Sequence, residues 1–220
     1  MNERQQRIVI FSGGRLGEWA LGLLGGGALA VGADRGALFL VRHGVRPDLA
    51  VGDFDSVSPE EQEQIRQASR EFRSCDPVDK DYTDTELAFR WALEQRPDEL
   101  ILTGVLGSRV DHSLANIQLL ALALAAGVRC SIVDDRNRLR LTDGELEMAR
   151  SAYAHVSLLP LGAPVTGVTL EGFRYPLREA TLALGQSLGI SNVLEAERGR
   201  IRIRSGLLLV IESGDEPSSV

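Results

Sequence analysis

Short apolar runs alternate with longer stretches of helical period through the first 133 residues of the chain. This alternation is typical of a parallel sheet whose strands are joined by crossover helices. It predicts strands at Ile8–Phe11, Ala28–Val31, Leu49–Val51, near Phe72, at Leu100–Thr103 and at Ser131–Val133. The first part of the chain is therefore expected to form an N-terminal three-layer α/β domain with a parallel sheet.

Three helices are predicted between these strands from the residues that cap helix ends. The segment Ser58-Pro59-Glu60-Glu61 is a capping box with proline at the first helical position, and Thr83-Asp84-Thr85-Glu86 is a second box. Asp111 is expected to cap the third helix, the apolar run from Leu114 to Ala126 that stops at Gly127.

After Asp135 the hydrophobic pattern changes to short segments of alternating apolar and polar residues, such as Val165–Leu170, with glycine or proline about every ten residues between them. Such spacing is typical of an all-β unit. The chain is expected to divide into an α/β domain over residues 1–135 and a small C-terminal β-sandwich over residues 136–220. Arg136-Asn137-Arg138 is the expected linker.

Charge and composition narrow the range of partners. The chain has 220 residues, 44% of them hydrophobic, and its 31 acidic against 24 basic residues give a net charge of −7. An acidic protein with only 5% aromatic residues is not expected to bind nucleic acid or anionic membrane surfaces. The charged start of the sequence and the lack of any apolar run near the roughly 18 residues of a membrane span lead us to expect a cytoplasmic location.

Carboxylates follow four of the predicted strands. Because ligands of open parallel sheets bind outside the carboxyl ends of the strands, these side chains are expected to converge. They are Asp34, Asp53 with Asp55, Asp79 with Asp81 and Asp84, and Asp111. Carboxylates that converge repel one another unless a cation joins them, and Mg²⁺ fills its remaining positions with water and phosphate oxygens. The pattern indicates a nucleoside triphosphate substrate, although helix capping alone would equally explain Asp84 or Asp111.

Two basic residues stand beside these carboxylates. Lys80 is the only lysine of the chain and lies between two aspartates, where it is placed to make a point-charge contact with phosphate. Arg109 follows Gly107 and Ser108 on a loop and is the expected bidentate phosphate ligand; the alternative is an ordinary surface arginine.

With these residues in place, the sequence resembles the thiamine pyrophosphokinases, in particular their bacterial branch. The order and spacing of several segments carry the resemblance: Val31–Leu40, Arg46-Pro47-Asp48 leading into Gly52–Val57, Asp79–Ala88, Thr103–Leu120, Leu159–Leu177 and Ile190-Ser191-Asn192. Two departures are visible. Ser108 replaces a second glycine, and Val193 stands where the family usually has an acidic residue.

The resemblance implies a homodimer that transfers a pyrophosphoryl group from ATP to thiamine, with Mg²⁺ as cofactor and thiamine held near the subunit boundary. It implies that Asp53, Asp55 and Asp84 hold the metal and form the catalytic group together with Asp81. On the ATP side it places Asp34, Lys80, Thr83, Arg109 and Asp111. On the thiamine side it places Thr169, Tyr175, Ser191 and Asn192.

The reaction that follows is in-line attack of the thiamine hydroxyl on the β-phosphorus of ATP, with AMP as leaving group. Either Asp55 or Asp81 could accept the hydroxyl proton. Two other classes of function stay open. A haloacid-dehalogenase-like phosphatase could use Asp53, Asp55, Thr103 and the pair Asp134-Asp135, although its lysine should follow the threonine and Lys80 precedes it. A non-enzymatic nucleotide-sensing module would bind ATP without turnover.

Overall fold

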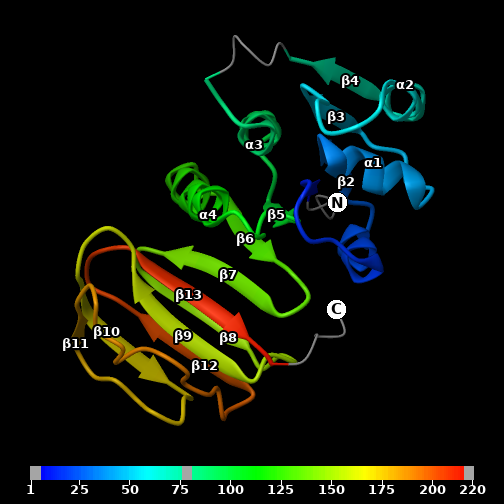
Figure 1. Cartoon of the computed structure of the whole chain (residues 1–220). Helices are drawn as coiled ribbons and strands as arrows, with labels where there is room; N and C mark the ends of the chain where they lie inside the picture. The colour runs from blue at the N-terminus through cyan, green and yellow to red at the C-terminus, as the bar shows by residue number, and fades with distance from the viewer. Residues whose placement is uncertain (1–5, 76–80, 216–220) are drawn as a thin grey trace, which may run out of the picture. The chain divides into compact units, whose positions relative to one another are not determined.

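The computed structural model describes residues 6–75 and 81–215, and these divide into two compact units. The first unit ends at Asp134 and the second begins at Asp135. Figure 1 shows the α/β character of the first unit and the all-β character of the second. The expected linker at 136–138 is wrong, because Asn137 and Arg138 already belong to strand β7 (Asn137–Thr142).

A parallel sheet forms the centre of unit 1. Its strands are β1 (Arg7–Phe11), β2 (Leu29–Ala33), β3 (Leu49–Gly52), β4 (Glu71–Ser74), β5 (Glu99–Thr103) and β6 (Arg129–Val133). They are ordered β4-β3-β2-β1-β5-β6, and every neighbouring pair is parallel. All six predicted strands are present, with ends that differ from the prediction by a few residues.

Within the described part of unit 1, four α-helices and one 3₁₀ helix lie between these strands. They are η1 (Glu18–Leu24), α1 (Arg35–Arg42), α2 (Pro59–Ala68), α3 (Asp84–Glu94) and α4 (Val110–Ala125). The capping box at Ser58 is confirmed, since its hydroxyl accepts from the Glu61 amide while the Glu61 carboxylate accepts from the Ser58 amide. Thr83 also caps α3 as expected, but the Glu86 carboxylate pairs with Arg90 instead of closing the box.

Three features of the helices depart from the sequence prediction. Asp111 does not cap α4, because the helix begins at Val110 and places Asp111 in its first turn. Neither η1 nor α1 was predicted, and neither has a side-chain cap. Gly36 instead allows α1 to start directly against β1, where a Cβ atom would lie 1.9 Å from the Phe11 carbonyl oxygen.

The helices of unit 1 cover both faces of its sheet (Figure 1). Apolar residues of β1 such as Val9 and Phe11 pack with η1 and α1 on one face, and α2 joins α1 in a neighbouring apolar cluster. Helix α3 contacts β1, β2 and β3 as well as α4. The predicted three-layer architecture is therefore confirmed, and both sets of helices begin near the carboxyl ends of the strands.

Unit 2 consists of two antiparallel sheets. Its remaining strands are β8 (Glu145–Ala149), β9 (His155–Pro160), β10 (Val165–Glu171), β11 (Ala180–Leu182), β12 (Arg198–Arg202) and β13 (Leu208–Ser213). One sheet has the order β7-β13-β9 and the other β11-β10-β12-β8. Residues of both sheets, among them Leu158, Val168 and Ile201, share one apolar core, which makes the unit the predicted sandwich.

Among the described residues, no helix combines the length and the apolar character that crossing a membrane would require.

Candidate active site

A cleft of about 690 Å³ opens at the carboxyl edge of the sheet in unit 1. The strand order reverses between β1 and β5, and in open α/β sheets ligands bind at such a switch point. The loops after β1, β2, β3 and β5 line the cleft together with the first turns of α3 and α4. The lining residues are 12–14, 33, 34, 53, 55, 81–85, 104–109, 112, 113 and 116.

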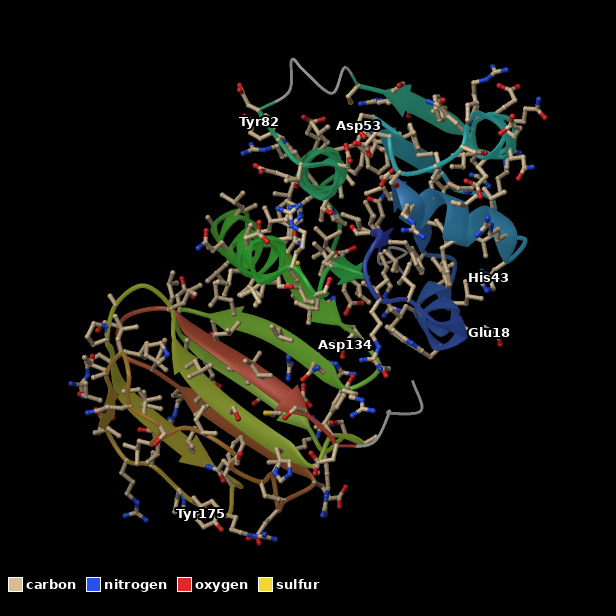
Figure 2. All side chains as sticks on the ribbon, in the orientation of Figure 1. Glu18, His43, Asp53, Tyr82, Asp134 and Tyr175 are labelled. Atoms are coloured by element: carbon tan, nitrogen blue, oxygen red, sulfur yellow. The ribbon has the colours of Figure 1, made fainter. Side chains whose placement is uncertain are left out.

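Three aspartates meet in this cleft. Asp34 directly follows β2, and Asp53 and Asp55 follow the adjacent strand β3, so parallel pairing of the two strands brings the three residues together. One carboxylate oxygen from each lies within 4.8 Å of the other two. The loop is held locally by the Asp55 amide, which donates to Asp53 Oδ1 at 3.2 Å, and by the Ser56 hydroxyl, which donates to Asp34. Figure 2 shows Asp53 at the end of its strand.

Asp34 has two unusual features that point to a cationic ligand. Its φ angle is +49°, a strained conformation for a residue other than glycine, and such strain concentrates at functional sites. Its Oδ1 atom is buried and has no hydrogen-bond partner among the described residues. A buried carboxylate oxygen without a donor is costly, and a hard cation would satisfy it. The donor set therefore fits Mg²⁺, with Asp34 joining Asp53 and Asp55.

Asp84 lies beside this group. A Cβ atom on Gly52, next to Asp53 in the chain, would be 3.2 Å from the Asp84 carboxyl carbon, so the absence of a side chain at Gly52 makes room for Asp84. Asp81 and Thr83 also line the cleft, although the Thr83 hydroxyl is engaged in capping α3. The predicted residues Asp79 and Lys80 lie outside the described residues.

The loop after β1 belongs to the site and was missed by the sequence analysis. The Ser12 and Gly14 amides donate to the carbonyls of Thr103 and Gly104 at 2.9 and 2.7 Å, which joins the loops that flank the switch point. A Cβ atom on Gly14 would lie 2.4 Å from the Gly104 carbonyl oxygen, so this approach requires glycine. Two adjacent glycines at the end of the first predicted strand were the signal that could have identified the loop.

Arg109 and Asp111 form an ion pair at the start of α4, with Nη2 2.7 Å from Oδ2. Hydrogen bonding to Arg109 is the main cause that lowers the pKa of Asp111, and the same contact raises the pKa of Arg109. Both side chains are about two-thirds exposed, at 68% and 65%. Arg109 lines the cleft and Asp111 does not, so Asp111 holds the guanidinium at the rim.

The predicted thiamine residues of unit 2 fall into two places. Asn192 is buried and hydrogen-bonds the backbone of Tyr175, and Ser191 precedes Asn192 in the chain. Tyr175 is 59% exposed and lies at the periphery of the unit (Figure 2). Thr169 instead bonds Glu179 and lines a separate cleft of about 860 Å³.

Comparison with known proteins covers both units. The catalytic-domain model of thiamin pyrophosphokinase matches residues 23–132, and the vitamin B1 binding domain model matches residues 144–208. The thiamine pyrophosphokinase of Bacillus subtilis (strain 168) is 35% identical over 189 residues, which are 85% of this chain and 88% of that protein.

Solved structures agree with these matches. The crystal structure of thiamine pyrophosphokinase from Bacillus subtilis has a TM-score of 0.88 at 33% identity and covers 96% of this chain and 100% of its own. The corresponding structure from Geobacillus thermodenitrificans has a TM-score of 0.86 at 35% identity, with coverages of 96% and 98%. The chain belongs to the thiamine pyrophosphokinase family.

Proposed function

We propose that this protein transfers the pyrophosphoryl group of ATP to the hydroxyl group of thiamine, giving thiamine diphosphate and AMP, with Mg²⁺ as cofactor. One observation carries the proposal: three carboxylates meet at the carboxyl edge of a parallel sheet, within the part matched by the family's catalytic domain. The same chain continues into a part matched by a vitamin B1 binding domain. A metal-phosphate site and a thiamine-binding unit together suit this two-substrate reaction.

The cleft offers different groups to different parts of ATP. Asp34, Asp53 and Asp55, with Asp84 beside them, would hold Mg²⁺, which when bound neutralises charge on the phosphate oxygens. Arg109 at the rim would bind phosphate oxygens. Lys80, Thr83 and Asp111 complete the proposed ATP side. The amides at the start of α4 add further donors to an anion, as at other helix N-termini.

The chain contributes positioning and proton transfer to the reaction. The thiamine oxygen forms a bond to the β-phosphorus, the bond between that phosphorus and the α–β bridging oxygen breaks, and AMP leaves with the bridging oxygen. The hydroxyl proton passes to a carboxylate in the cleft. Asp55, which is exposed, and Asp81, which lines the same cleft, are the two candidates for this base.

Unit 2 would supply the thiamine contacts through Thr169, Tyr175 and Ser191, with Asn192 next to Tyr175 in the structure. We also propose that the protein is a cytoplasmic homodimer with no nucleic-acid or membrane partner. Exposed apolar side chains are available for a subunit contact on two segments: Val110, Leu114 and Leu122 on α4, and Leu184, Leu188 and Ile190 before Ser191. Large apolar side chains gathered at a surface are typical of protein interfaces.

The two other classes of function are not favoured by the family match. For the phosphatase, Asp134 and Asp135 would have to join Asp53, yet neither of them lines the cleft. A nucleotide sensor would bind ATP without consuming it. An assay that measures AMP and phosphate released from ATP in the presence of Mg²⁺, with and without thiamine, separates the three functions. Thiamine-dependent AMP release supports the proposal; phosphate release without thiamine, or no turnover, would contradict it.

A further inference from the structure

A buried asparagine fixes the backbone of an exposed aromatic residue in unit 2. Asn192 is 5% exposed, whereas Tyr175 is 59% exposed. The Asn192 side chain accepts a hydrogen bond from the Tyr175 amide at 3.1 Å and donates to the Tyr175 carbonyl at 2.8 Å. Both backbone polar groups of Tyr175 are therefore bound to one side chain, outside any regular strand.

This arrangement continues a short antiparallel ladder. Phe173 and Leu194 form an isolated bridge, and the Arg174 amide donates to the Val193 carbonyl at 2.9 Å. At the next position the backbone of Asn192 cannot extend the ladder, because its own amide and carbonyl are bonded to Val156 at 2.9 and 2.8 Å. The Asn192 side chain takes over the pairing and so connects Tyr175 to strand β9.

The hydrogen-bond capacity of Asn192 limits what else it can contact. Its carbonyl oxygen accepts from the amides of Tyr175 and Val193, at 3.1 and 2.8 Å, which uses both lone pairs. Of its two N–H donors, one is used by the Tyr175 carbonyl. A buried amide in this state has little hydrogen-bonding capacity left for a ligand, whereas Tyr175 beside it is exposed.

We infer that Asn192 is a positioning residue for thiamine binding, which acts by holding Tyr175 so that its ring can stack on the cationic ligand. The inference rests on the proposed function. An aromatic face attracts a cationic ring, and an ordered residue loses less entropy on binding than a mobile one. Asn192 was expected from the sequence to contact thiamine itself; the geometry assigns that contact to Tyr175.

A double-mutant cycle tests this inference through the KM for thiamine. Tyr175→Ala and Asn192→Ala should each raise that KM about tenfold, with kcat and the KM for ATP changed less than about twofold. In the Tyr175→Ala background, Asn192→Ala should add less than about twofold, because the residue through which it acts is already gone. Glu197→Gln is the matched control: it removes an exposed carboxylate from the same segment and leaves in place both the Tyr175 backbone bonds and the contact of Arg174 with Tyr175.

The outcomes are distinct. Equal effects of Asn192→Ala in both backgrounds would show a direct thiamine contact and overturn the inference, as would an unchanged KM for thiamine in either single variant. If Asn192→Ala does not fold, Asn192→Asp completes the same cycle, since it replaces the donor to the Tyr175 carbonyl with an oxygen that repels it and keeps the acceptor of the Tyr175 amide. A wild-type protein that makes no thiamine diphosphate would instead overturn the proposed function, and the inference with it.

Discussion

Replacing Asp55 with asparagine should change stability and activity in opposite directions. The substitution preserves shape and the amide hydrogen bond to Asp53, and removes one of three charges that lie within 4.8 Å of one another. In the protein without metal, the loss of charge relieves repulsion with Asp34 and with Asp53. In the enzyme with Mg²⁺ and substrates bound, the substitution removes a carboxylate that is proposed to hold the metal.

Coulomb's law gives the size of the repulsion that the substitution removes. Two unit charges separated by 4.8 Å repel each other by about 0.9 kcal/mol in a water-like dielectric, the figure suited to an exposed group such as Asp55. Two such pairs give about 2 kcal/mol, which salt reduces to about 1. For a chain of this length, 1 kcal/mol corresponds to a rise in Tm of about 2–4 °C.

Differential scanning fluorimetry with EDTA and with Mg²⁺, together with a thiamine diphosphate assay, measures both effects. We expect Asp55→Asn to melt higher than wild type in EDTA, to gain less from Mg²⁺, and to lose activity by about 100-fold or more. Asp143→Asn, in the exposed turn between β7 and β8, is the control and should change neither quantity. A lower Tm in EDTA, or an undiminished Mg²⁺ shift, would refute the reasoning.

Three further predictions concern other parts of the chain. Glu212 is 1% exposed and lies 2.9 Å from Arg140, a partly buried guanidinium whose pKa is lowered mainly by burial. Glu212→Gln should lower the free energy of unfolding in urea by about 3 kcal/mol, and a loss below about 1 kcal/mol would contradict this. Gly14→Ala should raise the KM for ATP and leave that for thiamine unchanged, because the new methyl group displaces the loop at the switch point; equal effects on both substrates would refute it. Arg109→Gln should raise the pKa of Asp111, so the midpoint of its NMR titration should lie at a higher pH than in the wild-type protein. An unchanged midpoint would show that the ion pair does not form in solution.

The sequence was informative where local chemistry decides structure. Apolar runs located the strands of unit 1, and the caps at Ser58 and Thr83 located two helices, because a hydroxyl that bonds a nearby amide is a local interaction. The rule that ligands bind at the carboxyl ends of parallel strands led to Asp34, Asp53 and Asp55. These residues lie together because β2 and β3 are neighbours.

Features that depend on contacts between distant parts of the chain could not be predicted from the sequence. Helix α1 starts without a side-chain cap, through the unusual backbone of Asp34 and the contact of Gly36 with β1. The burial of Asn192 follows from three segments that meet only in the folded unit. In each case the deciding partner is a residue that no local pattern indicates.

The central claim is that the thiamine hydroxyl, and not water, attacks ATP. Reaction of ATP, Mg²⁺ and thiamine in ¹⁸O-labelled water, followed by mass spectrometry, tests it directly. We expect equal amounts of thiamine diphosphate and AMP, both without ¹⁸O, because the new bond uses the oxygen of thiamine and AMP keeps the bridging oxygen. Labelled phosphate or pyrophosphate, formed without thiamine diphosphate, would show hydrolysis by water and contradict the account.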